Sequence, residues 1–308
     1  MLRLAHRLLT LPIQCAADAH TAAWQRQNRI VQLIREQLRR DCPIIIADNV
    51  AEYVYGDPDA AFYDAEAGVP GVRFSFAHLG CLLPPFNVFF IEWRESLAWQ
   101  KRWPGGAPAT GWLIHPCDPD KKCLEVLPEA RHVLVCLHSF EQRNGQPAVS
   151  GYTRQFAIDA EGNYLGTTRR EIDESAHNAA STAFVALQTI GFMNCRNVEK
   201  VDATATEGPT AKWCRRQRVP ALTYRVIQID AQPSRKKRCA SDCAEGGGPS
   251  KALHICRGHF AHYVDDGVSQ GLFGRGQFGT FWVPSHTRGS LEHGRVVSTY
   301  NVNVPCNS

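Results

Sequence analysis

The order of helix-like and strand-like segments along this chain of 308 residues constrains its fold more than any other feature. Two stretches, residues 20–40 and 171–192, have the apolar spacing of amphipathic helices, and most other apolar segments have the length or alternation of strands. The two kinds of segment do not alternate regularly, which argues against a doubly wound parallel sheet. The sequence therefore predicts an α+β fold in which two main helices pack on a bent, mostly antiparallel sheet.

A change of composition near residue 200 suggests how the chain is divided. Residues 194–219 are polar, and a basic and then glycine-rich segment separates the strand at residues 222–229 from the last strands. We expect an α+β domain over residues 1–200 and a basic, β-rich C-terminal module over residues 201–308. One continuous domain with a long excursion is the alternative.

The N-terminal segment MLRLAHRLLTLPIQCAADA has the leucine content of an export signal, but His6 and Arg7 interrupt its apolar run. A charge at the centre of such a run favours an amphipathic helix over a signal peptide. No apolar run approaches the length that crosses a bilayer. The twelve cysteines are scattered, unlike those of a small disulfide-bonded domain. These features predict a cytoplasmic protein with reduced thiols and no membrane partner.

Positive charge is concentrated in one part of the chain. The whole sequence has a net charge of +4, whereas residues 211–257 contain eleven basic and three acidic residues, a net charge of +8. Segregation of this kind can attract a polyanion such as RNA or DNA. The candidate nucleic-acid-binding residues are Lys212, Arg215, Arg216, Arg218, Arg235, Lys236, Lys237 and Arg238. Two solvated loops are the alternative interpretation of the same charges.

Histidine and arginine recur between Leu253 and Asn303. Two His–Arg pairs, each spaced by two residues, could share one face on neighbouring strands. Histidine titrates near neutrality and can act as acid or base on RNA, and the planar guanidinium of arginine binds phosphate oxygens. The candidate catalytic residues of a metal-independent, ribonuclease-like site are therefore His259, His286, Arg257 and Arg288. A structural role in the sheet is the alternative.

Zinc binding is a second interpretation of this region. Thiolate and imidazole groups, which zinc prefers, occur at Cys239, Cys243, His254 and Cys256. Three residues separate the two loop cysteines, one more than a zinc knuckle usually has, so zinc is the weaker hypothesis. The neighbouring aromatic residues are either stacking faces for bases or parts of a core. They are Phe260, Tyr263, Phe273, Phe278, Phe281 and Trp282.

Two further features carry local expectations. The segment GLFGRGQFG, residues 271–279, lacks the lysine of a phosphate-binding loop and predicts a hairpin turn whose glycines adopt positive φ. Glu92 lies between Ile91 and Trp93, where a carboxylate must be paired or face water. Arg94 or a distant arginine is the expected partner of this carboxylate.

The motifs HICRGHF, GLFGR, GTFWVPSHTRG and VVSTYNVNV together resemble a group of uncharacterised proteins of phages, prophages and other bacterial mobile elements. That group has an H-x-x-RGHF…LFG…H-x-RG pattern near its C-terminus, and the likeness covers the last third of this chain best. The matching residues are His254, Arg257, Gly258, His259, Phe260, Gly274, His286, Arg288, Gly289 and Tyr300. FMNCRNV, residues 192–198, resembles a short motif of the same group. The resemblance implies a mobile-element setting and no mechanism.

Charge, histidine pattern and resemblance together lead to one expected function. We expect a nucleic-acid-interacting protein of a phage or mobile element, with ribonuclease-like chemistry at His259 and His286 as its catalytic form. The alternative is a non-catalytic, regulatory protein that binds another protein and uses its histidines and arginines structurally.

Overall fold

The computed structural model describes residues 3–13, 21–40, 42–55, 63–64, 69–70, 79–102, 104–167, 175–202, 212, 215–216, 222–229, 252–256, 258–268, 270–271, 276–283, 286–288 and 290–295. Among them, eight strands form the main sheet, in the order β8-β7-β6-β5-β4-β1-β10-β9. The strands are β1 (Ile44–Ile46), β4 (Phe89–Arg94), β5 (Ala109–Cys117), β6 (His132–Glu141), β7 (Pro147–Ile158), β8 (Tyr164–Thr167), β9 (Val198–Asp202) and β10 (Tyr224–Ile229).

The main sheet is mostly antiparallel. Strands β4 to β8 form a meander in which each strand pairs antiparallel with the next. The short apolar strand β1 pairs in parallel with both β4 and β10, and β9 pairs antiparallel with β10 at the far edge. Because β10 lies between β1 and β9, residues beyond position 200 belong to the same sheet as the earlier strands.

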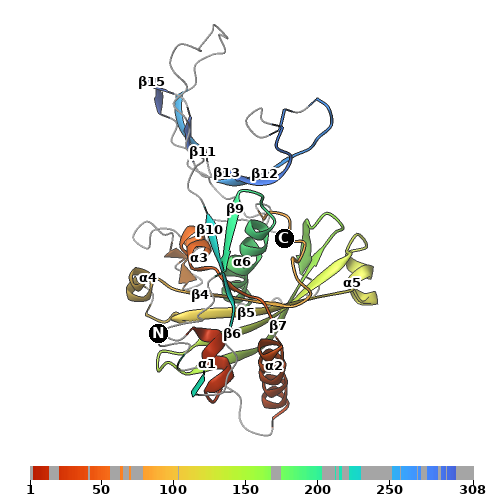
Figure 1. Ribbon diagram of the computed structural model, residues 1–308, viewed down its shortest axis with the longest axis vertical. Helices are drawn as coiled ribbons and strands as arrows, with labels where there is room; N and C mark the ends of the chain where they lie inside the picture. Colours follow the sequence, from red (N-terminus) through yellow and green to blue (C-terminus); the bar gives the residue numbers. More distant parts are fainter. Residues whose placement is uncertain are drawn as a thin grey trace, which may run out of the picture.

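Helices cover both faces of this sheet (Figure 1). On one face, α1 (Leu4–Thr10) and α2 (Ala22–Arg39) share a core with Phe90, Leu113 and Tyr224. On the other face, α3 (Asp48–Tyr55) and α6 (Ser175–Met193) pack against a second core. The short helices α4 (Leu97–Arg102) and α5 (Lys121–Val126) follow β4 and β5. The predicted α+β class is confirmed, with α2 and α6 as its two main helices.

Helix α2 illustrates why the sequence predicted these elements well. The Thr21 hydroxyl caps its first turn by accepting a hydrogen bond from the Trp24 N–H at 3.1 Å. Ile30, Ile34 and Leu38 recur at helical spacing and are all buried. Apolar residues at this spacing form a continuous stripe along one side of a helix, so the helix is stable when that stripe packs on the sheet.

Strand β9 was not predicted, because the sequence expectation for residues 194–219 was a loop. Glu199 and Lys200 are exposed, and only Val198 of this strand is buried. An edge strand carries such charged residues without losing its ladder of backbone hydrogen bonds, so its sequence lacks the apolar signal of a central strand. Further along the chain, Gly271 and Gly276 have φ of +69° and +65°, as expected for the segment between the last hairpin strands.

In the described part of the chain, three small sheets accompany the main one. Strand β12 (His259–Tyr263) pairs antiparallel with β13 (Gly279–Val283), and both lie beside the main sheet (Figure 1). Strands β14 (His286–Arg288), β11 (Ala252–Cys256) and β15 (Ser290–Arg295) form a second sheet, and β11 and β15 extend away from the main body at the top of Figure 1. Strands β2 (Tyr63–Asp64) and β3 (Val69–Pro70) form the third.

Within the residues described above, no helix combines the length and the apolar composition that crossing a membrane requires.

Candidate functional site

Strand β11 pairs antiparallel with β14, and β12 pairs antiparallel with β13; we call these two halves together the C-terminal ribbon. His259 pairs with Val283 in its first half. In the second half, Cys256 pairs with His286. Cys256 precedes His259 by three residues, and His286 follows Val283 by three residues. The two halves are therefore separated by the same number of residues on both sides of the ribbon.

The ribbon separates the candidate catalytic residues among different strands. His259 is exposed on β12, which pairs with β13, whereas His286 lies on β14, which pairs with β11. Arg288 is the register partner of His254. Arg257 lies outside the described residues. The histidines are thus on strands that are not direct partners, and their joint catalytic role remains a prediction.

Of the predicted basic residues, the structure describes three, and all three are exposed: Lys212, Arg215 and Arg216. The others lie outside the described residues, as do Cys239 and Cys243 of the predicted zinc site. Only the backbone of His254 and Cys256 is described, in β11. Across the described part of the chain, no three histidine, cysteine or acidic side chains gather in a way that could hold a metal ion.

An aromatic cluster fastens the ribbon to the main body. Phe260 of β12 and Trp282 of β13 have ring centroids 4.9 Å apart, and both rings contact Phe192 at the end of α6, at 5.3 and 4.8 Å. Tyr53 of α3 packs edge-on against Trp282 at 5.1 Å. Trp282 is only 3% exposed. Because these rings pack against one another, they belong to a core and are not faces for stacking bases.

Glycines make this close approach possible. A Cβ at Gly258 would lie 2.5 Å from Cζ2 of Trp282 and 2.9 Å from the Tyr53 hydroxyl. A Cβ at Gly80 would lie 2.9 Å from the Phe260 ring. Any larger residue at either position would therefore push the ribbon away from α3 and α6.

The turn after α6 adds hydrogen bonds to the same attachment. The Asn197 side chain acts like a backbone peptide group, since its amide donates to the Trp282 carbonyl at 2.7 Å and its oxygen accepts from the Trp282 N–H at 2.8 Å. The Arg196 N–H donates to the Thr280 carbonyl at 2.9 Å. The segment FMNCRNV thus holds strand β13 against the main body through these hydrogen bonds.

Three exposed or partly exposed polar residues lie on or next to strands β12 and β13, and we call them the Arg196 patch: Arg196, His262 and Thr280. His262 Nδ1 lies 3.0 Å from the Thr280 hydroxyl. The Arg196 side chain lies over Gly279, where φ is +118° and a Cβ would approach Arg196 Nε to 2.7 Å. A glycine at this position therefore leaves room for the guanidinium, which is exposed and able to bind an anion.

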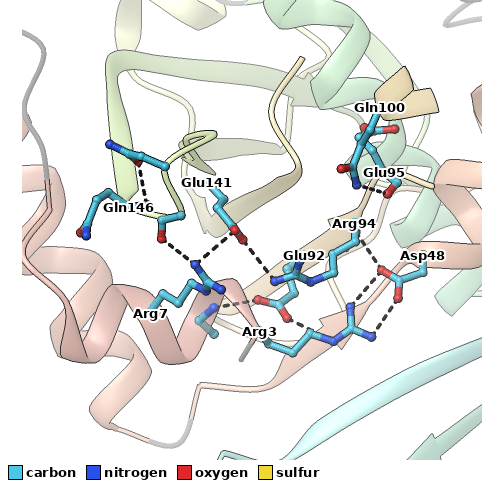
Figure 2. Close-up of polar contacts among 12 residues, drawn as sticks. Arg3, Arg7, Asp48, Glu92, Arg94, Glu95, Gln100, Glu141 and Gln146 are labelled. Carbon is cyan, nitrogen blue, oxygen red and sulfur yellow. Dashed lines mark hydrogen bonds and ion pairs between the residues drawn. The ribbon is translucent and has the colours of Figure 1, made fainter. Parts of the chain in front are cut away.

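A second group of charges, which we call the α1 junction, joins α1 to the sheet (Figure 2). The Arg3 guanidinium donates twice to Asp48, at 3.0 and 2.8 Å. The Glu141 carboxylate forms ion pairs with Arg7 and with Arg94, each at 3.1 Å. Because each pair links different elements, these charges fix the N-terminal helix in place.

Glu92 lies at the centre of the α1 junction and is 1% exposed. Its Oε2 accepts the Ala5 N–H at 2.8 Å, which satisfies a donor in the first turn of α1. Arg3 Nε lies 3.9 Å from Oε1, so a distant arginine is its cationic neighbour, as expected from the sequence. Burial raises the pKa of Glu92 to about 7, although the Ala5 and Arg3 contacts oppose this rise.

Sequence reasoning did not single out Arg196 or Asn197 as site residues. Their motif, FMNCRNV, was recognised, but its position against β13 depends on contacts that span 85 residues of the chain. A local pattern cannot reveal such contacts, because the spacing that creates them is set by the tertiary fold.

Comparisons of the chain with protein-family models, with curated proteins and with solved structures give no match.

Proposed function

We propose that this protein binds nucleic acid through the Arg196 patch and the adjoining C-terminal ribbon, in the phage or mobile-element setting that the sequence motifs suggest. The supporting observation is the Arg196 patch itself: Arg196 is exposed with its side chain over Gly279, and on the paired strands the His262 imidazole contacts the Thr280 hydroxyl. Guanidinium and hydroxyl groups are among the side chains that contact phosphates in such complexes.

Other exposed histidine and basic residues support the same function. His259 is exposed on β12, and Lys212, Arg215 and Arg216 are exposed on the segment that precedes β10. A two-stranded antiparallel ribbon has dimensions that the major groove of B-DNA accommodates. The described cysteines are free thiols, in keeping with a cytoplasmic location for this activity.

The test is binding of labelled RNA and DNA over a range of salt concentrations. Binding should weaken as salt rises, because phosphate contacts release counterions. Arg196→Ala should weaken binding to every sequence, and Arg40→Ala should not, since Arg40 is an exposed arginine at the end of α2, which packs on the opposite face of the sheet. Failure to bind at low salt would contradict the proposal and favour a protein partner.

The same experiment tests the catalytic form of the proposal. Cleavage of the RNA that is lost in His259→Ala and in His286→Ala would extend the function to a ribonuclease. Binding without cleavage would limit the function to recognition.

A further inference from the structure

A ladder of three stacked rings lies on the α6 face of the main sheet, and we call it the ring ladder: Trp112, His138 and Phe140. Trp112 and His138 are register partners on β5 and β6, with ring centroids 4.5 Å apart and planes inclined by 27°. Phe140 follows His138 at 5.5 Å and 26°. This stacking holds the imidazole of His138 in one orientation.

Two nitrogen atoms of the ring ladder are buried without a hydrogen-bond partner among the described residues. They are Nε1 of Trp112, a residue only 1% exposed, and Nε2 of His138. The buried Gln188, on the helix that packs over the same face of the sheet, also has an oxygen without a partner. Leaving a polar group unsatisfied costs about 1–3 kcal/mol, so native proteins retain few such groups without a reason.

Arg154 brings positive charge to the same place. It pairs with Cys136 on β6, two residues before His138, so Arg154 and His138 are diagonal neighbours on one face of the sheet. The regular ladder between β6 and β7 is interrupted at His138, because pairing passes from Leu137–Thr153 directly to Ser139–Val149. Arg154, His138 and Phe140 are each partly exposed, so the two buried nitrogen atoms lie next to side chains that reach solvent.

The chemistry of these groups selects a ligand class. The indole N–H can only donate, the guanidinium can only donate, and Nε2 of His138 donates in one of the two neutral tautomers. Burial, with the nearby Arg154 charge as a second cause, lowers the pKa of His138 to about 4, so the imidazole is neutral near pH 7. A set of donors with one fixed positive charge is complementary to an anion with several acceptor oxygens.

We propose that Trp112, His138 and Arg154 form a binding site for a small oxyanion, separate from the surface assigned to nucleic acid. The oxyanion would accept hydrogen bonds from the indole and the imidazole and would be balanced by the guanidinium.

Sulfate is a suitable probe, because its charge is constant over the pH range of the experiment, and chloride at equal ionic strength is the control. Titration calorimetry should detect sulfate binding to the wild-type protein. Trp112→Phe and His138→Phe keep a stacked ring and remove one donor each, and each should weaken sulfate binding roughly tenfold or more. His138→Gln retains a donor and should bind more tightly than His138→Phe.

Trp99→Phe is the matched control for loss of a buried indole, since Trp99 is 5% exposed and packs on Tyr55 instead of the ring ladder. Arg196→Ala should leave sulfate affinity at this site unchanged, which separates this proposal from the nucleic-acid proposal. Equal effects of sulfate and chloride, or wild-type affinity in both ring-ladder variants, would mean that the site holds only water, and the proposal would be wrong.

A measurement on the wild-type protein covers the case in which the variants fail to fold. Sulfate beside His138 stabilises the imidazolium, so it should raise the pKa of this histidine above its value of about 4, and affinity should increase as the pH falls. Histidine proton resonances followed by NMR during a pH titration would show this shift. Identical titration curves with sulfate and with chloride would overturn the proposal.

Discussion

The α1 junction and the Arg196 patch both use arginine, but they place it in different surroundings. At the α1 junction, Glu141 is 3% exposed in its side chain and receives both Arg7 and Arg94. Next to the ribbon, Arg196 is exposed; its backbone N–H donates to the Thr280 carbonyl, and its side chain lies over Gly279. In the first case the arginines satisfy buried carboxylates, and in the second the guanidinium faces solvent.

This difference shows how structural and ligand-binding charges can be told apart. A buried arginine paired with a carboxylate contributes to folding and has little capacity for a partner. An exposed arginine whose position is fixed by its own backbone contributes little to stability and keeps its donors available. The comparison therefore predicts that changes at the α1 junction affect stability and changes at the Arg196 patch affect binding.

The largest effect is expected from Glu141→Leu, which leaves Arg7 and Arg94 without their shared carboxylate. Removing one partner of a buried pair costs about 3–5 kcal/mol, so the free energy of unfolding should fall by this amount in urea denaturation. Glu141→Gln, which keeps hydrogen-bond acceptance, should be less severe. If the folded Glu141→Leu variant also loses nucleic-acid affinity, the proposed separation between the two regions fails.

Glu92→Gln tests the buried carboxylate of the same region through pH. Because the folded pKa of about 7 exceeds the unfolded value of 4.5, the folded state binds the proton more tightly, and Glu92 contributes stability that is lost as the pH rises through this interval. Wild-type stability relative to Glu92→Gln should therefore fall by about 2.5 kcal/mol between about pH 5 and about pH 8.

The subtraction of the variant is necessary because other groups titrate nearby. Burial lowers the pKa of His6 and of His138 to about 4, so their contributions are lost in the opposite direction, as the pH falls. Glu95 resembles Glu92, since burial raises its pKa to about 7. A difference between wild type and Glu92→Gln that is independent of pH would contradict the role given to Glu92.

Gly258→Ala tests whether nucleic-acid binding requires the C-terminal ribbon to pack closely against α3 and α6. The new Cβ would overlap Trp282, and an overpacked contact of this kind costs about 1–3 kcal/mol. We expect reduced burial of Trp282, measured by fluorescence quenching, together with weaker nucleic-acid binding. Gly267→Ala is a useful control, because a Cβ there meets no atom within 4 Å, although its φ of +72° adds some strain.

Arg196→Ala should have the smallest effect on stability and sharpens the comparison most directly. The free energy of unfolding should change by no more than about 0.5 kcal/mol, as is usual for an exposed side chain. The slope of log affinity against log salt should decrease by about 0.9 if one duplex phosphate contact is lost. An unchanged slope with unchanged affinity would remove Arg196 from the interface.

The sequence predicted the fold class because its strongest signals are local. The buried stripe of α2 and the apolar strand β6 follow from residue spacing over short windows. Strand β9 was missed because its exposed Glu199 and Lys200 hide the strand pattern. The contacts of Glu92 with α1 were expected only in kind, since Ala5 and Glu92 are 87 residues apart.

The candidate site was predictable in composition but not in arrangement. His259 and the basic residues were identified from their types, and those that are described are exposed. Which residues come together depends on the two hydrogen bonds between the Asn197 side chain and the Trp282 backbone. An asparagine that takes the place of a backbone peptide group has no signature in the sequence.

The equal spacing between the two halves of the C-terminal ribbon determines where the chain tolerates changes of length. Residues added between Tyr263 and Gly279 would lengthen only the connection and leave every strand pair in step. A single residue added between Cys256 and His259 would instead shift β11 by one position relative to β12 and reverse the faces of its side chains. Natural variation in length should therefore be found in the connection and be absent from the junction of the two halves.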